Sequence, residues 1–301
     1  IYVDYLQIKM IKKGIILAGG TGTRLSPLTK SVNKQLLPIH DKPMIFYPLS
    51  VMMLANIKKI LMIVNPGQIN NFKSLLGDGS RYGIDISYKI QDKPRGLPDA
   101  FILGKTFINK DSVALILGDN FFYGQSLTKK LEKSSLHRSG ATIFLKEVSF
   151  PENYGVAKIK KKKIEKIIEK PKKFISRNAI TGLYFFDKKV SDYANKLKKS
   201  KRGELEIIDL INEYKKNKTL SSEFIGRGGA WLDTGSISDY YKTSAFVQAI
   251  ENRQGLKIAC LEEIAFKNNW IKKTDIDNAI KFYGNCEYSN YLKNLIYKSN
   301  Y

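Results

Sequence analysis

Short apolar runs alternate with longer amphipathic stretches through the first part of the chain. Apolar runs rich in isoleucine and valine indicate buried strands, whereas apolar residues spaced three or four apart indicate helices. Because strands that alternate with helices form parallel sheets covered on both faces, we expect an α/β fold that binds its ligands at the carboxyl ends of the strands. The predicted strands are 13–18, 60–64, 84–90 and 113–117, and the predicted helices are 43–56, 68–76 and 97–107.

The pattern changes after a further strand predicted at 142–148. No internal repeat and no linker rich in proline, glycine or serine divides the chain. We therefore expect one main domain over 10–252, a helical C-terminal region over 253–301, and an upstream extension at 1–9. The later elements are two short strands within 154–169, an apolar strand at 180–186, helices at 188–198, 204–215 and 236–252, and a turn-rich helical segment at 261–301.

The composition is that of an ordinary globular protein, since 43% of the 301 residues are hydrophobic and 26% are charged. The longest apolar stretch, 44–55, contains a proline and is shorter than the ~20 residues that a membrane-spanning helix needs. Residues 1–9 lack the apolar core and the cleavage site of a signal peptide. With only two cysteines and two histidines, a Cys/His zinc site is disfavoured and a reducing, cytoplasmic location is expected. No membrane partner is expected.

Lysine and arginine total 51 against 28 acidic residues, which gives a formal net charge of +23. A positive field of this size attracts polyanions, whether nucleic acid, anionic lipid or phosphorylated metabolites. The alternative is a compositional bias toward lysine, isoleucine and asparagine, with many lysines on the solvated surface. The lysine-rich run 158–173 alternates with isoleucines and lacks interleaved aromatic residues, so we interpret it as the solvated side of a hairpin and expect no nucleic-acid site there.

The segment 14–24, GIILAGGTGTR, runs from an apolar strand into a glycine-rich loop that ends in Arg24. Glycines let backbone N–H groups turn toward an anion, and a guanidinium is a planar cation suited to phosphate oxygens. No GK[ST] follows, and Leu25 replaces the third glycine of GxGxxG. We interpret the segment as a phosphate-binding loop; the alternative is a tight turn after an edge strand. The following NKQLLP offers Lys34 as a second phosphate ligand and Gln35 as a hydrogen-bonding side chain.

Two aspartates stand where a cation bound to phosphates would be held. Asp119 follows the buried strand of VALILGDN, at the mouth of the predicted sheet, and Asp233 lies in WLDTG. One carboxylate holds magnesium poorly, so we expect the two to share it; the alternative for either is a helix N-cap or a turn. Glu169 and Lys170 end another apolar strand before Pro171, and Lys170 is expected to project into the cleft as a point charge for a second phosphate.

The chain contains, in this order, the motifs GIILAGGTGTRL, NKQLLP, DKPMIFYPL, LLGDG, LGDN, YGV, EKP, TGLYFFD, RGELEI, AWLDTG and ENRQGLKIAC. Together they resemble the bacterial glucose-1-phosphate thymidylyltransferases, a short form of the sugar nucleotidyltransferase family. The resemblance runs from about residue 13 to the C-terminus and implies a Rossmann-like nucleotidyltransferase fold, with a mixed, mostly parallel central sheet covered by helices and a small helical C-terminal appendage. The catalytic domain over 10–252 would include inserted sugar-binding strands.

The resemblance also implies an activity and an assembly. A thymidylyl group would pass, with Mg²⁺, from dTTP to α-D-glucose 1-phosphate, giving dTDP-glucose and pyrophosphate, the first step toward dTDP-rhamnose and related deoxysugars. The enzyme would be a homotetramer with a regulatory nucleotide site at a subunit contact. The residues matching that regulatory site are Tyr123, Gly124, Cys260 and Glu263.

Individual roles follow from the same resemblance. Arg24, Lys34, Lys170 and Asp119 would be catalytic, and Asp119 with Asp233 would bind the Mg²⁺. Gln91 and Gly96 match the positions that read the thymine edge. The nucleotide-binding positions are Leu17, Gly19, Gly20, Thr21, Gly22, Thr23, Arg24, Lys34, Gln35, Gln91 and Gly96. The sugar-phosphate-binding positions are Asn120, Tyr154, Gly155, Glu169, Lys170, Ile180 and Tyr184.

The base-reading segment 92–100 departs from the Asp-Gly-Leu-Ala-Gln-Ala type of segment usual in that family. Arg95, Pro98 and Asp99 replace an acidic, a small and an amide residue. Pro98 removes a backbone donor and fixes one dihedral angle, so it either starts the following helix or reshapes the base pocket. A second departure is Gly229, where an aromatic residue is more usual.

Three alternatives stay open at this point. The first is a related sugar-1-phosphate nucleotidyltransferase that uses UTP or CTP, or another hexose 1-phosphate. The second is a basic nucleic-acid-binding protein, which would need a reading element that the sequence does not display. The third is a dinucleotide-dependent oxidoreductase, which is disfavoured because the glycine fingerprint fails and no acidic residue follows it at the expected spacing.

Overall fold

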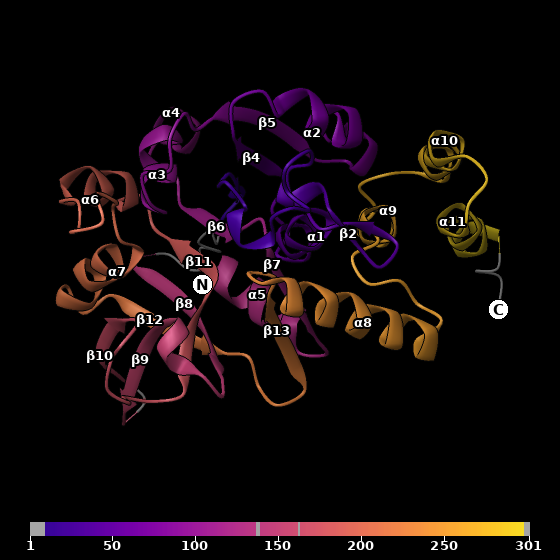
Figure 1. Cartoon of the computed structure of the whole chain (residues 1–301). Coiled ribbons are helices and arrows are strands. Elements are labelled where there is room, and N and C mark those ends of the chain that lie inside the picture. The colour runs from indigo at the N-terminus through magenta and orange to yellow at the C-terminus, as the bar shows by residue number, and fades with distance from the viewer. Residues whose placement is uncertain (1–9, 137–138, 162, 298–301) are drawn as a thin grey trace, which may run out of the picture.

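The computed structural model describes residues 10–136, 139–161 and 163–297. The extension expected at 1–9 lies outside the described residues. Within them, no helix combines the length and the apolar character needed to cross a lipid bilayer. A central sheet carries helices on both faces, and two small sheets complete the β-structure (Figure 1).

The central sheet is mixed and has nine strands. They are β1 (Lys13–Ala18), β4 (Lys59–Val64), β5 (Asp85–Ile90), β6 (Val113–Leu117), β8 (Ala141–Glu147), β9 (Gly155–Lys160), β10 (Lys163–Glu169), β11 (Asn178–Phe186) and β12 (Leu220–Phe224). The main order is β10-β9-β11-β6-β1-β4-β5. β1 pairs in parallel with β4 and with β6, and β4 pairs in parallel with β5. The loops that follow these four strands therefore gather at one edge of the sheet.

At β11 the sheet changes from parallel to antiparallel. β11 runs antiparallel to β6, β8 and β9, and β9 forms an antiparallel hairpin with β10. The register of β11 against β8 shifts between Ile180 and Tyr184, as a β-bulge would produce. The expected parallel pairing thus holds for β5-β4-β1-β6. β8 also pairs in parallel with β12, a strand that was not predicted. The lysine-rich run 158–173 lies largely on the β9–β10 hairpin, as predicted.

Two small sheets were not predicted from the sequence pattern. One joins β2 (Pro38–Ile39) to β3 (Lys42–Pro43), and the other joins β7 (Asn120–Gly124) to β13 (Gly229–Asp233). In the second sheet Asn120 is the partner of Asp233. This pairing connects segments far apart in the sequence, and no local periodicity encodes such a contact.

Two groups of helices contribute to two hydrophobic cores, one on each face of the sheet, and apolar residues along the parallel strands face the two cores alternately. In β1, Ile16 lies in the core of the first group and Ile15 in that of the second. Figure 1 shows the second group on one side of the sheet. The first group is α1 (Phe46–Leu54), α2 (Ile69–Leu76), α5 (Leu127–Ser135), α9 (Leu261–Lys267), α10 (Lys273–Tyr283) and α11 (Glu287–Tyr297). The second is α3 (Asp99–Leu103), α4 (Lys105–Ile108), α6 (Val190–Lys196) and α7 (Ile207–Lys216).

Three helical regions differ from, or refine, the sequence prediction. The single helix predicted at 97–107 is wrong, because α3 and α4 are separated at Gly104, where a Cβ would lie 2.8 Å from the Ala100 carbonyl oxygen. Helix α5 was not predicted, since its buried apolar residues are only Leu127 and Leu131. The long helix α8 (Ile237–Gln254) begins after Ser236, whose hydroxyl accepts from the Asp239 N–H.

Candidate active site

The glycine-rich loop leaves the carboxyl end of β1 and turns back sharply. Gly20 and Gly22 have φ angles of +99° and +62°, a region that residues with a Cβ rarely adopt. Asn65, which follows β4, holds the loop from the side: the Gly20 N–H donates to Asn65 Oδ1 at 3.0 Å, and Asn65 Nδ2 donates to the Gly20 carbonyl at 2.7 Å. The Asn65 side chain therefore fixes the loop at Gly20 from both its N–H and its carbonyl.

A polar cavity of about 130 Å³ adjoins this loop. Gly20, Thr21, residues 29–34, Asn65 and Gln68 line it. A cavity lined by hydroxyls, amides and lysines is suited to a hydrated anion such as a phosphate chain. Asn65 and Gln68 were missed in the sequence analysis, because a lone amide after a strand carries no motif.

Lys34 and Gln35 lie on one 3-10 turn, Lys34–Leu36, capped by the Asn33 side chain, which accepts from the Gln35 N–H at 2.9 Å. Lys34 is buried, and its Nζ lies 2.6 Å from Asp119 Oδ2. Gln35 Nε2 donates to the Gly19 carbonyl at 3.3 Å, while Gln35 Oε1 is buried and accepts from no donor among the described residues. This turn therefore links the glycine-rich loop to the first aspartate.

The pairing of β7 with β13 brings the two aspartates together. Asp119 directly precedes β7 and Asp233 ends β13, while Thr234 Oγ1 donates to the Asp119 carbonyl at 2.8 Å. The pKa of Asp233 is raised to about 6, first by burial and then by the neighbouring Asp119 charge, while Lys34 and Arg24 lower it in part. A Cβ at Gly235 would lie 2.9 Å from Arg24 Nη1 and 3.1 Å from Asp233 Oδ2, so Arg24 belongs to the same group.

The Asn120 side chain holds the carboxylate of Asp119 in place. Its Nδ2 donates to Asp119 Oδ1 at 3.1 Å, and its Oδ1 accepts from Trp231 Nε1 at 2.7 Å and from the Gly182 N–H at 3.0 Å. In this conformation the Asn120 amide is thus engaged within the protein.

The predicted sugar-phosphate residues gather at the open end of the β9–β10 hairpin. Gly155 pairs with Glu169, and a Cβ at Gly155 would lie 3.1 Å from Glu169 Oε2. Lys170 has a φ of +41°, and its N–H donates to the Tyr154 carbonyl at 3.0 Å. Burial raises the pKa of Tyr184, and the nearby Glu169 charge adds to this. Ile180, on the same strand as Tyr184, is buried in the second core.

Tyr154 connects this end of the hairpin to the aspartates. Its ring lies 5.0 Å from the Trp231 ring, and its pKa is raised by burial and by the charge of Asp233, while Arg24 lowers it. The predicted phosphate, metal and sugar positions therefore form one continuous group.

The base-reading segment, residues 92–100, lies between Gln91 and the loop before α7. Gln91 follows β5, and its Nε2 donates to Asp99 Oδ2 at 2.8 Å. Gly96 has a φ of +93°, and a Cβ there would lie 2.0 Å from the Leu205 carbonyl oxygen. The Leu205 N–H donates to the Arg95 carbonyl at 2.8 Å, so this segment packs on the loop before α7. Helix α3 begins directly after Pro98, which has a φ of −62°.

A family model described as Nucleotidyl transferase matches residues 13–250. The chain belongs to the nucleotidyl transferase family. A glucose-1-phosphate thymidylyltransferase of Neisseria meningitidis is 49% identical over 95% of this chain and 100% of its own length. The enzyme of that name from Mycolicibacterium smegmatis is 46% identical over 94% of this chain and 99% of its own length.

Solved structures show the same fold for this nucleotidyl transferase. A Bacillus anthracis protein assigned as a glucose-1-phosphate thymidylyltransferase, crystallised with sucrose, is 39% identical, with a TM-score of 0.73 over 78% of this chain and 94% of its own. A UDP-glucose pyrophosphorylase complexed with UDP-glucose is 24% identical, with a TM-score of 0.69 over 81% of this chain and 100% of its own. At that identity the likeness concerns the fold alone.

The aspartate pair of this nucleotidyl transferase has the donor chemistry of a hard divalent cation. Both ligand groups are carboxylates, which Mg²⁺ prefers over nitrogen or sulfur. The raised pKa of Asp233 means that its charge is poorly compensated by the protein alone. A further cation beside Lys34 and Arg24 would relieve the repulsion between the two carboxylates, so the residues present fit the ion.

One feature of the sugar-phosphate side was missed, although its motif RGELEI had been singled out. Arg202 precedes α7 and binds Glu206 through two nitrogens, with Nη2 lying 2.7 Å from Oε2. Glu206 and Arg202 both influence the pKa of Glu169, and Lys170 lowers that of Glu206. Arg202 is thus a further cation next to Glu169 and Lys170.

The expected regulatory residues lie on β7 and at the start of α9. Tyr123 accepts at its hydroxyl from Gln254 Nε2 at 2.8 Å. Cys260 is buried, and Glu263 binds Lys267 Nζ at 2.6 Å and accepts from the Tyr291 hydroxyl at 2.5 Å. Their regulatory role stays a prediction.

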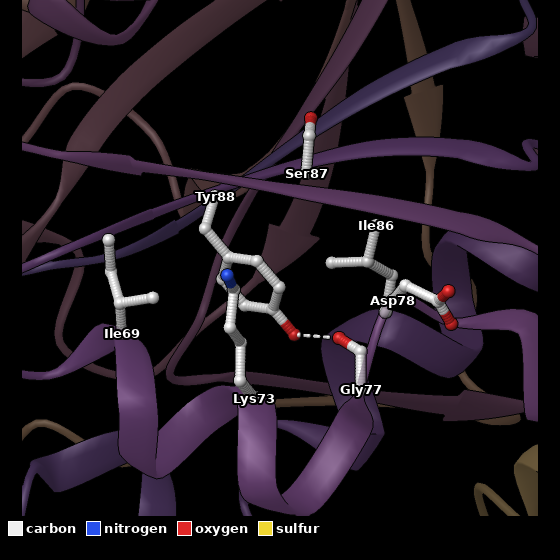
Figure 2. A pocket seen from close by; sticks show the side chains of 7 residues that line it. All are labelled: Ile69, Lys73, Gly77, Asp78, Ile86, Ser87 and Tyr88. Atoms are coloured by element: carbon white, nitrogen blue, oxygen red, sulfur yellow. Dashed lines mark hydrogen bonds between the residues drawn. The ribbon is translucent and has the colours of Figure 1, made fainter.

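The described residues also contain a larger cavity, of about 590 Å³, that includes none of the predicted site residues. Figure 2 shows it between α2 and β5, with Tyr88 donating to the Gly77 carbonyl at 2.7 Å and Lys73 beside the Tyr88 ring. Size alone therefore does not locate the chemistry of this nucleotidyl transferase.

Proposed function

We propose that this nucleotidyl transferase transfers a thymidylyl group from dTTP to α-D-glucose 1-phosphate, with Mg²⁺, giving dTDP-glucose and pyrophosphate. The observation that carries the proposal is the match, at 49% identity over 95% of the chain, to a relative named for this reaction. The cluster of Arg24, Lys34, Asp119 and Asp233 beside the glycine-rich loop supports the same chemistry.

The reaction requires two anions to meet. An oxygen of the sugar phosphate attacks the α-phosphorus of the triphosphate, the bond from that phosphorus to the bridging oxygen breaks, and pyrophosphate leaves with the electron pair. The attacking oxygen is already an anion near neutral pH, so no general base is needed. Bringing the charges together requires fixed cations on both sides of the reacting centre.

We assign the residues on each side accordingly. Arg24 would neutralise the leaving pyrophosphate, and Lys170 the attacking phosphate. Asp119 and Asp233 would hold Mg²⁺, which when bound withdraws charge from the phosphate oxygens. Lys34 would bind the triphosphate once it leaves Asp119. The other proposed contacts are Leu17, Gly19, Gly20, Thr21, Gly22, Thr23, Gln35, Gln91 and Gly96 for the nucleotide, and Asn120, Tyr154, Gly155, Glu169, Ile180 and Tyr184 for the sugar phosphate.

A homotetrameric assembly stays a prediction of the resemblance, and a cytoplasmic location stays a prediction of the low cysteine content. The electrostatic scheme depends on neither of them.

A pyrophosphate-release assay tests the proposal. Initial rates are measured with dTTP, UTP and CTP against glucose 1-phosphate and other hexose 1-phosphates, with and without Mg²⁺. The expected result is release that needs Mg²⁺ and is fastest with dTTP and glucose 1-phosphate. Faster release with UTP or CTP would favour the related sugar-1-phosphate nucleotidyltransferases, and no release with any pair would overturn the proposal.

A further inference from the structure

We infer that Asp99 is a positioning residue that fixes the side-chain amide of Gln91, and that it thereby selects thymine or uracil over cytosine. The inference rests on the proposed nucleotidyl transfer, because it concerns the base of the same triphosphate. It goes beyond that proposal by assigning a role to a residue that touches neither base nor phosphate.

The contact between the two side chains has a defined polarity. Gln91 Nε2 donates to Asp99 Oδ2 at 2.8 Å, and the two residues are only 6% and 3% exposed. An ionised carboxylate can only accept hydrogen bonds, so the NH₂ group of the amide, and not its oxygen, faces Asp99. Turning the amide over would place two acceptors against each other away from water, and would remove a charge-assisted hydrogen bond.

This polarity fixes what Gln91 presents to the cleft. Gln91 follows β5 at the carboxyl edge of the sheet, and its Oε1 lies 3.2 Å from where a Cβ on Gly19 would stand. Within the described part of the chain, no donor is bound to Oε1, and one hydrogen of Nε2 is left over after the bond to Asp99. Gln91 therefore offers one acceptor and one donor beside the glycine-rich loop.

The pyrimidine bases differ in the pattern that such a pair can read. Thymine and uracil carry an N–H at ring position 3 beside a carbonyl oxygen, whereas cytosine carries an acceptor nitrogen beside an amino group. The fixed amide of Gln91 complements the first pattern. Cytosine would require the opposite amide orientation, which Asp99 opposes.

A purely structural role for Asp99 makes a different prediction. Asp99 is the first residue of α3, and an acidic side chain in the first turn stabilises a helix. Loss of that role would lower activity with every nucleotide to the same extent. The ratio between nucleotides therefore separates the two roles.

The test compares kcat/KM for dTTP, UTP and dCTP, at saturating glucose 1-phosphate, in the wild type, Asp99→Asn and Asp92→Asn. Asparagine can pair with Gln91 in either orientation, so the preference for dTTP over dCTP should fall by ~10-fold, the factor that one such hydrogen bond is worth. The dTTP to UTP ratio should stay unchanged. Asp92→Asn removes the same charge from an exposed position of the same segment and should leave both ratios unchanged.

Equal losses with dTTP and dCTP in Asp99→Asn would overturn the inference. In a Gln91→Ala background the same substitution should leave the ratio unchanged, because the residue acts through Gln91. If Asp99→Asn does not fold, as judged by thermal melting, Asp99→Gln supplies the same amide and carries the same expectation. A wild type without activity on dTTP would instead overturn the proposed function.

Discussion

Two groups of charged side chains in this molecule differ in how well opposite charges compensate their carboxylates. The first lies where the β2–β3 hairpin meets α8, and we call it the hairpin charge cluster. It consists of Asp41, Lys42, Glu251 and Lys257. Lys42 Nζ lies 2.9 Å from Glu251 Oε1, Lys257 Nζ lies 3.5 Å from Glu251 Oε2, and both lysines bind Asp41. Burial by itself raises the pKa of Asp41, but the two lysines outweigh it, so the net direction is down.

In the candidate active site, Asp119 is paired with Lys34, whereas the charge of Asp233 is poorly compensated. The pKa of Asp233 is raised to about 6, chiefly by burial and then by the charge of Asp119, although Lys34 and Arg24 lower it. The same residue type is thus stabilised as an anion in one place and destabilised in the other. The hairpin charge cluster holds β2, β3 and α8 together, whereas in the site the anionic form of Asp233 is disfavoured and a bound cation would stabilise it.

The largest effect is expected from removing one carboxylate of the hairpin charge cluster, and it concerns the free energy of unfolding. Glu251→Gln leaves two buried lysines with one carboxylate, and removing one member of such a group costs roughly 3 kcal/mol of unfolding free energy or more. Urea unfolding measures this loss, with Glu213→Gln as the matched control. Glu213 pairs with Lys216 at 2.6 Å on an exposed helix face, where a pair is worth only ~0.5 kcal/mol. Equal losses in the two variants would contradict the distinction.

The second effect is expected from removing a carboxylate of the candidate active site, and it concerns turnover. Asp119→Asn or Asp233→Asn should lower turnover by ~100-fold or more, since each removes a carboxylate that would hold the cation at the transition state. Unfolding free energy should not fall as it does in Glu251→Gln. The measurement is kcat at saturating Mg²⁺, with Asp92→Asn as the control at an exposed position. Near-normal, Mg²⁺-dependent turnover in both aspartate variants would disprove the assigned metal site.

The same two regions show what sequence alone predicts. The glycine-rich loop and Asp119 were predicted from their residue types and their positions after strands, and Asp233 was proposed as the second carboxylate that magnesium would need. The structural means of bringing the two aspartates together, the pairing of β7 with β13, was not predicted. Helix α8 was predicted from its apolar spacing, yet nothing near Glu251 in the sequence points to Lys42, which is 209 positions away. Local pattern predicts elements and candidate ligands, whereas long-range pairing decides which charges are balanced.

A third prediction sharpens the comparison on the sugar-phosphate side. Arg202 is held by Glu206 near Glu169 and Lys170, and we expect it to bind the phosphate of the second substrate. Arg202→Met should raise KM for glucose 1-phosphate by ~10-fold, as the loss of one charge-assisted hydrogen bond implies. KM for dTTP should change much less. Lys201→Met, at the neighbouring exposed position, is the control. A rise in KM for dTTP alone would show that Arg202 does not bind the phosphate of the second substrate.

The smallest effect concerns how the free energy of unfolding depends on pH when no divalent cation is added. The pKa of Asp233 in the folded state, about 6, is above the ordinary value of 3.8, so the folded state binds that proton more tightly than the unfolded state. The resulting stabilisation is complete below pH ~4 and is lost as the pH rises to ~6 and beyond, which amounts to at least ~1 kcal/mol.

Asp233→Asn has no such proton to lose. In EDTA, its unfolding free energy relative to the wild type should therefore rise between pH 4.5 and pH 8. Saturating Mg²⁺ should remove most of that difference by stabilising the ionised wild type. Asp41→Asn is the matched control from the hairpin charge cluster. Because the pKa of Asp41 is lowered from 3.8, the difference between this variant and the wild type should stay flat from pH 4.5 to pH 8 and change only below pH ~4. A flat profile for Asp233→Asn would mean that its charge is as well balanced as that of Asp41.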